Sequence, residues 1–186
     1  MEKQTIRNLI FTALFIVLYW VGAYIKIPVG PVPIALTNMF IILAGLFLGP
    51  FYGLASVFIY LLLGAIGVPV FTGGGSFALF AGPTGGFLIG YLFNVFITGL
   101  IASRGRKTVL KGIIGAAAGT IALHLCGVAW LKIKLDLTWV KAVSMGSLPF
   151  LPGDGLKIAA AAALWRSLLP LWERYSSEAD IDEPDA

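Results

Sequence analysis

Six apolar stretches, most of them long enough to cross a lipid bilayer, dominate this sequence. They cover residues 6–24, 34–48, 51–66, 85–103, 109–130 and 156–172. A spanning helix needs about 20 residues, and backbone groups in lipid must bond within their own segment, so each stretch predicts a helix. None keeps a sustained apolar–polar alternation, which argues against a β-barrel. The two shortest stretches meet at Gly49-Pro50 and together hold about 33 residues, too many for one crossing, so we expect two crossings there.

Composition supports a membrane protein. Of the 186 residues, 59% are apolar and only 12% are charged, whereas a soluble domain is about 25% charged. This excludes an ordinary cytosolic enzyme, a nucleic-acid-binding module and a disordered protein. The first stretch is too long for the apolar region of a signal peptide, so we expect it to remain as a helix. Cys126 is the one cysteine, which excludes an intrachain disulfide.

The distribution of Lys and Arg predicts the orientation, because cytoplasmic segments carry an excess of both. With six crossings the two sides hold eight and five of them. The richer side has Lys3, Arg7, Arg104, Arg106, Lys107, Lys111, Arg166 and Arg174, and the other side has Lys26, Lys132, Lys134, Lys141 and Lys157. We therefore expect a multi-pass protein of the cell membrane with both termini in the cytoplasm.

The connections on the predicted outer side are long and rich in turn-forming residues. They cover 26–33, 67–83 and 132–152. Long structured loops on one face usually carry function, which here suits the capture of an external molecule. Within the last of them, 137–145 could form a short interfacial helix with Trp139 and Lys141 as boundary residues.

The end of the chain differs from the rest in composition. Six of the nine acidic residues fall within 173–186. Such a charge run is typical of solvated disorder. We expect one membrane domain over 1–172 and a disordered, acidic cytoplasmic tail over 173–186.

Asp154 and Lys157 form the most informative charged pair. Apart from the acidic tail, Asp154 is one of three acidic residues, and Lys157 follows it by three positions on the same helical face. Charges at the mouth of an apolar helix are costly unless they are paired or wetted. One interpretation is a self-neutralising pair that also caps the helix. The other is that both groups face a pocket, where the acid accepts ligand N–H groups and the ammonium donates to a carbonyl or carboxylate.

The other candidate features carry less chemistry. Glycines at 73–75 and 82–86 could line the same outer cavity or form a re-entrant turn, and no Gly-Lys-Ser/Thr sequence follows to bind a phosphate. Glycines spaced four apart, such as Gly86 and Gly90, suit close helix packing within the chain, or less often a face for a partner helix. His124 has no acid or cysteine at ligand spacing in the sequence, and no catalytic set appears. We therefore expect no enzyme activity, no catalytic or metal-binding residues and no cofactor.

Several ordered motifs together resemble the BioY family over nearly the whole chain up to Trp172. They are Gly30-Pro-Val-Pro-Ile34, Leu43-Ala-Gly-Leu-Phe-Leu-Gly-Pro50, Tyr60-Leu-Leu-Leu-Gly-Ala-Ile-Gly-Val-Pro-Val-Phe71, Gly82-Pro-Thr-Gly-Gly-Phe87, and Pro149-Phe-Leu-Pro-Gly-Asp154 with Lys157. Members of this family are bacterial biotin transporters, the substrate-binding S components of energy-coupling factor (ECF) importers. The resemblance implies an all-α S-component fold of six transmembrane helices with an outward-facing biotin pocket. It also implies two kinds of partner, a membrane coupling protein and two cytoplasmic ATPases.

The resemblance also implies site residues. In the family, the Asp and Lys that match Asp154 and Lys157 belong to the pocket, and the glycine-rich loop and the first outer loop border it. The remaining ligand-binding candidates are Gly74, Gly75, Ser76, Phe87 and Tyr91, with Phe71 and Trp130 as further ring neighbours and Lys26 as a further group for the biotin carboxylate. For docking to the coupling protein, S components tend to show Ala-x-x-x-Ala on the first helix, and here Ala13 is followed by Val17.

Biotin matches the chemistry of this pair. It offers two ureido N–H donors, a ureido carbonyl, an apolar bicycle and a carboxylate, so Asp154 can accept an N–H and Lys157 can donate to the carbonyl. Two alternatives stay open at this point. One is an S component of the same fold for another small vitamin, and the other is a small integral-membrane enzyme acting on a lipid or isoprenoid.

Overall fold

The structure, a computed structural model, describes residues 2–27, 32, 34–105 and 107–181. Helices dominate this part of the chain. Their bounds are α1 (Glu2–Tyr24), α2 (Thr37–Ala65), α3 (Ala78–Ala81), α4 (Gly85–Ala102), α5 (Val109–Lys134), α6 (Trp139–Gly146) and α7 (Leu151–Ile181). Two short strands, β1 (Lys26–Ile27) and β2 (Ile34–Ala35), pair antiparallel between α1 and α2. Residues 28–31 and 33 of the first outer loop, and Arg106 of the basic cluster, lie outside the described residues.

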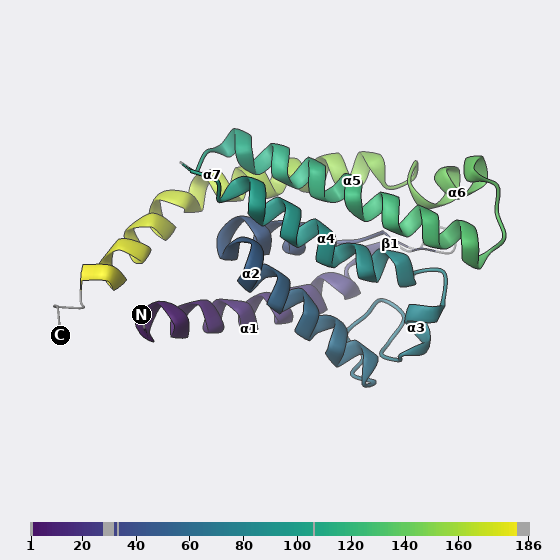
Figure 1. Ribbon diagram of the computed structural model, residues 1–186, viewed down its shortest axis with the longest axis horizontal. Coiled ribbons are helices and arrows are strands. Elements are labelled where there is room, and N and C mark those ends of the chain that lie inside the picture. Colours follow the sequence, from purple (N-terminus) through teal and green to yellow (C-terminus); the bar gives the residue numbers. More distant parts are fainter. Residues whose placement is uncertain (1, 28–31, 33, 106, 182–186) are drawn as a thin grey trace.

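Helix α2 reverses direction at Gly49. Gly49 has φ 74° and ψ −170°, a backbone conformation that is strained for any residue with a side chain. Pro50 begins the next helical turn. A Cβ placed on Gly53 would lie 3.5 Å from Ala44 O and 3.6 Å from Gly45 Cα, so the two legs of α2 run back along each other. Figure 1 shows this reversal at the end where α1 begins. The helix break expected at Gly49-Pro50 is therefore present.

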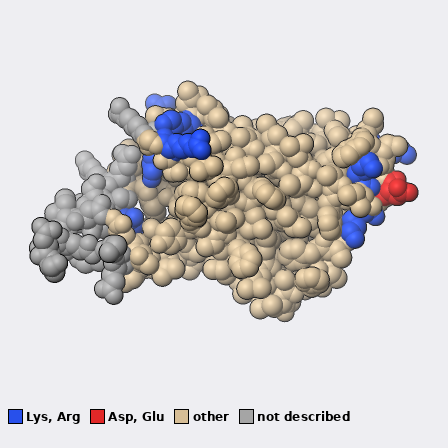
Figure 2. Space-filling view, viewed as in Figure 1, with Lys and Arg blue, Asp and Glu red and all other residues tan. Residues whose placement is uncertain are grey.

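The long helices run along the long axis of the molecule, with α4 between α2 and α5 (Figure 1). Four of them are long and apolar enough to cross a membrane: α2, α4, α5 and the part of α1 from Gln4 to Tyr24. α1 begins and α7 ends at the same end of the molecule (Figure 1). Figure 2 shows the visible Lys and Arg side chains gathered at the two ends, with an uncharged belt between them. This distribution suits a protein whose middle lies in lipid.

The connection between α5 and α7 and the end of the described chain both contain helix. The short helix expected over 137–145 is present as α6, which begins at Trp139 and ends at Gly146. α7 continues past Trp172 to Ile181, so the described backbone of the acidic segment is helical. Residues 173–181 contain no proline or glycine, so nothing in their backbone stops the helix. Residues 182–186 of the expected tail lie outside the described part of the chain.

Glycines let α4 and α5 approach closely along their length. A Cβ on Gly86 would lie 2.2 Å from Trp130 Cβ and 2.7 Å from Cys126 O. Farther along, a Cβ on Gly115 would lie 2.8 Å from Thr98 O. These distances are shorter than real Cβ contacts, so the small residues are required for packing inside the chain.

Replacing Gly86 by Ala tests this packing. The added methyl group would collide with Trp130 Cβ and with the main-chain oxygen of Cys126. Neither atom can move unless α5 shifts, so the substitution should destabilise the protein by about 1–3 kcal/mol. The control is Gly155→Ala in α7, where a Cβ would meet nothing within 4 Å. We expect a lower midpoint of thermal unfolding in detergent for Gly86→Ala only. Equal midpoints for the two variants would contradict the close α4–α5 contact.

Candidate ligand-binding site

Asp154 and Lys157 lie in the first two turns of α7, and both are buried. Asp154 is 5% exposed and Lys157 is 7% exposed. Lys157 Nζ donates to Asp154 Oδ1 at 3.3 Å, so the ion pair considered from the sequence is present. Both residues also line a cavity. The two charges are thus paired with each other, and both groups also line the cavity.

His124 of α5 is a third member of this cluster, and sequence reasoning missed it. Its Nε2 lies 2.7 Å from Asp154 Oδ2, and the residue is 9% exposed. The acid that was absent from its neighbourhood in the sequence comes from α7, 30 positions away. One signal was available, because a titratable residue within a membrane-spanning stretch is by default a candidate functional residue.

A chain of buried polar groups reaches the carboxylate oxygen of Asp154 that His124 does not contact, Oδ1. Asn38 Nδ2, at the start of α2, donates to Asp154 Oδ1 at 3.3 Å. Asn94 Nδ2 of α4 donates to Asn38 Oδ1 at 2.7 Å, and Thr98 Oγ1 donates to Asn94 Oδ1 at 3.1 Å. Three helices, α2, α5 and α7, thus supply direct partners to one carboxylate.

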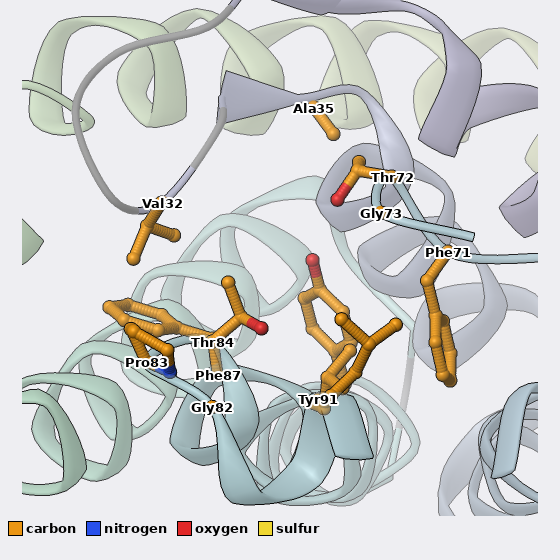
Figure 3. Close-up of a pocket in the computed structure, with 12 residues that line it drawn as sticks. Val32, Ala35, Phe71, Thr72, Gly73, Gly82, Pro83, Thr84, Phe87 and Tyr91 are labelled. Atoms are coloured by element: carbon orange, nitrogen blue, oxygen red, sulfur yellow. The ribbon is translucent and has the colours of Figure 1, made fainter. Parts of the chain in front are cut away.

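Two cavities meet beside this cluster. The smaller, about 40 Å³, contains the ionic groups and is lined by Val32, Ala35, Asn38, Phe87, Tyr91, Leu123, His124, Phe150, Asp154 and Lys157. The larger, about 300 Å³, is lined by Val32, Ala35, Phe71, Thr72, Gly73, Leu79, Gly82, Pro83, Thr84, Phe87, Leu88 and Tyr91. Val32, Ala35, Phe87 and Tyr91 border both, so they form the wall that the cavities share. In Figure 3 the Tyr91 hydroxyl points into the larger cavity.

The glycine-rich segments border the larger cavity through Gly73 and Gly82. Gly73 lines it, whereas Gly74, Gly75 and Ser76 are not among the described lining residues of either cavity. Gly74 has φ 100°, a conformation that favours glycine. A Cβ on Gly75 would lie 2.0 Å from Val68 O. Ser76 Oγ accepts from the Ala78 N–H at the start of α3.

The other aromatic and basic candidates have definite positions. Phe87 and Tyr91 line both cavities, and Phe71 lines the larger one. Trp130 Nε1 donates to Gly82 O at 2.9 Å and so holds the loop before α4. Lys26 Nζ donates to Thr72 O, which places this cation at the rim of the larger cavity.

The two docking candidates lie on the first helix. Ala13 is exposed, and Val17 is 52% exposed. They share this outward side of α1 with Leu9, Leu14 and Val21. The surface is apolar and carries no ionic group at these positions.

The amino-acid sequence is similar to those of known proteins. The family model described as "BioY family" matches residues 1–174. The chain is 40% identical over 159 residues to the probable biotin transporter BioY of Pyrococcus horikoshii, covering 85% of this chain and 93% of that protein. It is 38% identical over 175 residues to the biotin transporter BioY of Rhizobium etli, covering 88% and 93%.

A solved structure is similar as well. It is a crystal structure of the S-component for biotin from an ECF-type ABC transporter, with a TM-score of 0.85 and 32% sequence identity. The match covers 91% of this chain and 94% of the other. Because the family model spans most of the chain and the relatives match over nearly their full length, this chain belongs to the BioY family.

Proposed function

We propose that this protein binds biotin with high affinity from outside the cell and serves as the substrate-specific subunit of an ECF importer. The observation that carries the proposal is the buried Asp154–Lys157 pair, which faces a cavity instead of lipid. The similar proteins are named as biotin transporters or as an S-component for biotin, and none of those named above is an enzyme.

Asp154 has room for one further hydrogen bond. An ionised carboxylate offers about four acceptor positions. Oδ1 accepts from Asn38 and Lys157, and Oδ2 lies against His124 Nε2. Among the residues that the structure describes, one acceptor position therefore stays free for a ligand. A ureido N–H of biotin supplies a single directed donor of this kind.

Lys157 complements the acid. Its ammonium group has three donors, of which one bonds to Asp154. A ureido carbonyl lies close to its own N–H groups, so a ligand that donates to Asp154 brings an acceptor within reach of Lys157. The ionic pair thus matches the donor and acceptor of one ureido group.

The sizes of the two cavities support a proposal for the rest of the ligand. About 40 Å³ beside the ionic groups holds one or two water molecules but no fused ring. We infer that the sulfur-containing ring and the acid chain occupy the cavity of about 300 Å³, and that the ureido ring fused to it lies at the border formed by Phe87 and Tyr91 with its polar edge toward Asp154. Lys26 at the rim, the Tyr91 hydroxyl and loop N–H groups are the candidates for the carboxylate.

We propose six membrane crossings with both termini in the cytoplasm. The two legs of α2 count as separate crossings, and the part of α7 before Trp172 is the last. This places α1's start, the turn at Gly49 and the α4–α5 connection on the cytoplasmic side. The basic residues of that connection agree with this orientation.

The proposed partners are a membrane coupling protein and two cytoplasmic ATPase subunits. The sequence holds no Gly-Lys-Ser/Thr phosphate-binding loop, so the partners would hydrolyse the ATP. The exposed side of α1 around Ala13 and Val17 is the proposed contact with the coupling protein. Lipid would cover the remaining uncharged belt seen in Figure 2.

Asp154→Asn should weaken biotin binding roughly tenfold or more, because the amide replaces a charged acceptor in a buried hydrogen bond. The measurement is the Kd of labelled biotin for the purified protein. Asp136→Asn is the matched control: Asp136 is exposed, its φ of 47° suits Asn, and it lies on the same side of the membrane. If Asp154→Asn binds biotin like the parent, the proposed site is wrong. If the parent protein does not bind biotin, the proposed ligand is wrong.

Lys157→Ala should also weaken biotin binding roughly tenfold, since it removes the donor to the ligand and leaves Asp154 with one partner fewer. Lys141→Ala, which changes an exposed lysine of α6, serves as the control and should bind like the parent. The same binding assay compares the two. Equal affinities for both variants would show that the Lys157 ammonium does not face the ligand.

The orientation predicts which exposed positions react from outside the cell. In a Cys126→Ser background, a membrane-impermeant maleimide should label Ser144→Cys of α6 in intact cells. It should label Ser103→Cys, at the end of α4, only after the membrane is opened. The reverse pattern, or labelling of both in intact cells, would contradict the proposed topology.

A further inference from the structure

We propose that Thr98 and Asn94 are positioning residues for the ligand: they fix the Asn38 side chain so that its NH₂ group, and not its carbonyl, faces Asp154. This inference rests on the proposed binding of biotin at Asp154. Neither Thr98 nor Asn94 is among the described residues that line the two cavities at the site. They act on the ligand only through Asn38, which does line the smaller cavity.

The hydrogen bonds of this chain run in one direction. The Thr98 hydroxyl, which also lies 3.2 Å from Gly115 O, donates to Asn94 Oδ1. Asn94 Nδ2 donates to Asn38 Oδ1, and Asn38 Nδ2 donates to Asp154 Oδ1. Each amide thus uses its carbonyl toward Thr98 and its NH₂ group toward Asp154. If one amide rotated by half a turn, two acceptors or two donors would face each other.

The direction of these hydrogen bonds matters for a ligand because they end at the Asp154 carboxylate. An ionised carboxylate can only accept hydrogen bonds, and Lys157 keeps a positive charge beside it. If Asn38 turned its carbonyl toward Asp154, two acceptors would repel each other at the site. The carboxylate would then have to move or take its hydrogen bond from elsewhere, and the acceptor position left for the ligand would change.

The hydrogen bonds from Thr98 to Asp154 are buried, so water cannot easily take the place of a lost partner. Asn94 and Thr98 are 0% exposed and Asn38 is 5% exposed. A Cβ on Gly119 of α5 would lie 2.4 Å from Asn94 Oδ1 and 2.6 Å from Thr98 Oγ1, so this glycine leaves the space that the two side chains occupy. In such a dry contact an unpaired polar group keeps its full desolvation cost.

The test compares two threonines that are both buried. Thr98→Val keeps the shape of the side chain and removes the hydroxyl. Thr120→Val makes the same change on α5, where the Thr120 hydroxyl is buried and has no hydrogen-bond partner among the described residues. We expect Thr98→Val to raise the Kd for biotin about threefold to tenfold. Thr120→Val and Thr98→Ser, which keeps the hydroxyl, should bind like the parent.

A double-mutant cycle separates positioning from a general loss of stability. Asn38→Leu keeps a branched side chain but breaks the link to Asp154. If Thr98 acts through Asn38, adding Thr98→Val to Asn38→Leu should leave the Kd unchanged, whereas independent effects would multiply. Parent-like binding by Thr98→Val, an effect matched by Thr120→Val, or full multiplication in the cycle would each overturn the proposal.

Two further measurements keep the outcomes distinct. If Thr98→Val does not fold, Asn94→Leu removes the next donor of the chain and should raise the Kd about tenfold. Parent-like binding by that variant would equally overturn the inference. If the parent protein binds no biotin, the proposed function fails. The double-mutant cycle is then measured from the thermal unfolding midpoints of the free protein and its variants. Additive shifts of the unfolding midpoint would then show that Thr98 and Asn38 are not linked.

Discussion

The rest of this site depends on one buried carboxylate. Moving an ion out of water costs several kcal/mol unless charged and polar partners replace the water. Asp154 has such partners from three helices: Asn38 of α2, His124 of α5 and Lys157 of α7. These contacts join α2, α5 and α7 at the end of the molecule where the cavities lie. Among the described residues, the same contacts leave one acceptor position of this carboxylate unused, and this is the position proposed for the ligand.

The packing of α4 against α5 supports the site from a distance. Gly86, Gly115 and Gly119 allow main chain to approach main chain, which a larger residue would prevent. Because Gly119 has no side chain, Asn94 and Thr98 fit between the helices and stay dry. The close packing that membrane helices need thus also makes room for the polar chain that reaches Asp154.

Much of the fold could be predicted, and the site could be predicted in part. The apolar stretches, the break at Gly49-Pro50 and the helix α6 depend on local properties, and each is present. Asp154 and Lys157 are close in sequence, so their contact followed from helical spacing. His124 and Asn94 could not be assigned in this way, because their partners lie 30 and 56 positions away. Charge composition does not by itself stop a helix, and α7 continues into the acidic segment to Ile181.

The sequence alone determined that this chain is a helical membrane protein, since the length and apolarity of its stretches leave few other ways to satisfy the backbone in lipid. It also determined that Asp154 and Lys157 lie together at the start of the last helix. Only the tertiary structure decided which side chains complete that pair and which loop residues border the cavities. Gly73 lines the larger cavity while its neighbours Gly74 and Gly75 do not, because loop direction depends on contacts such as that of Gly75 with Val68 O, which no local pattern encodes.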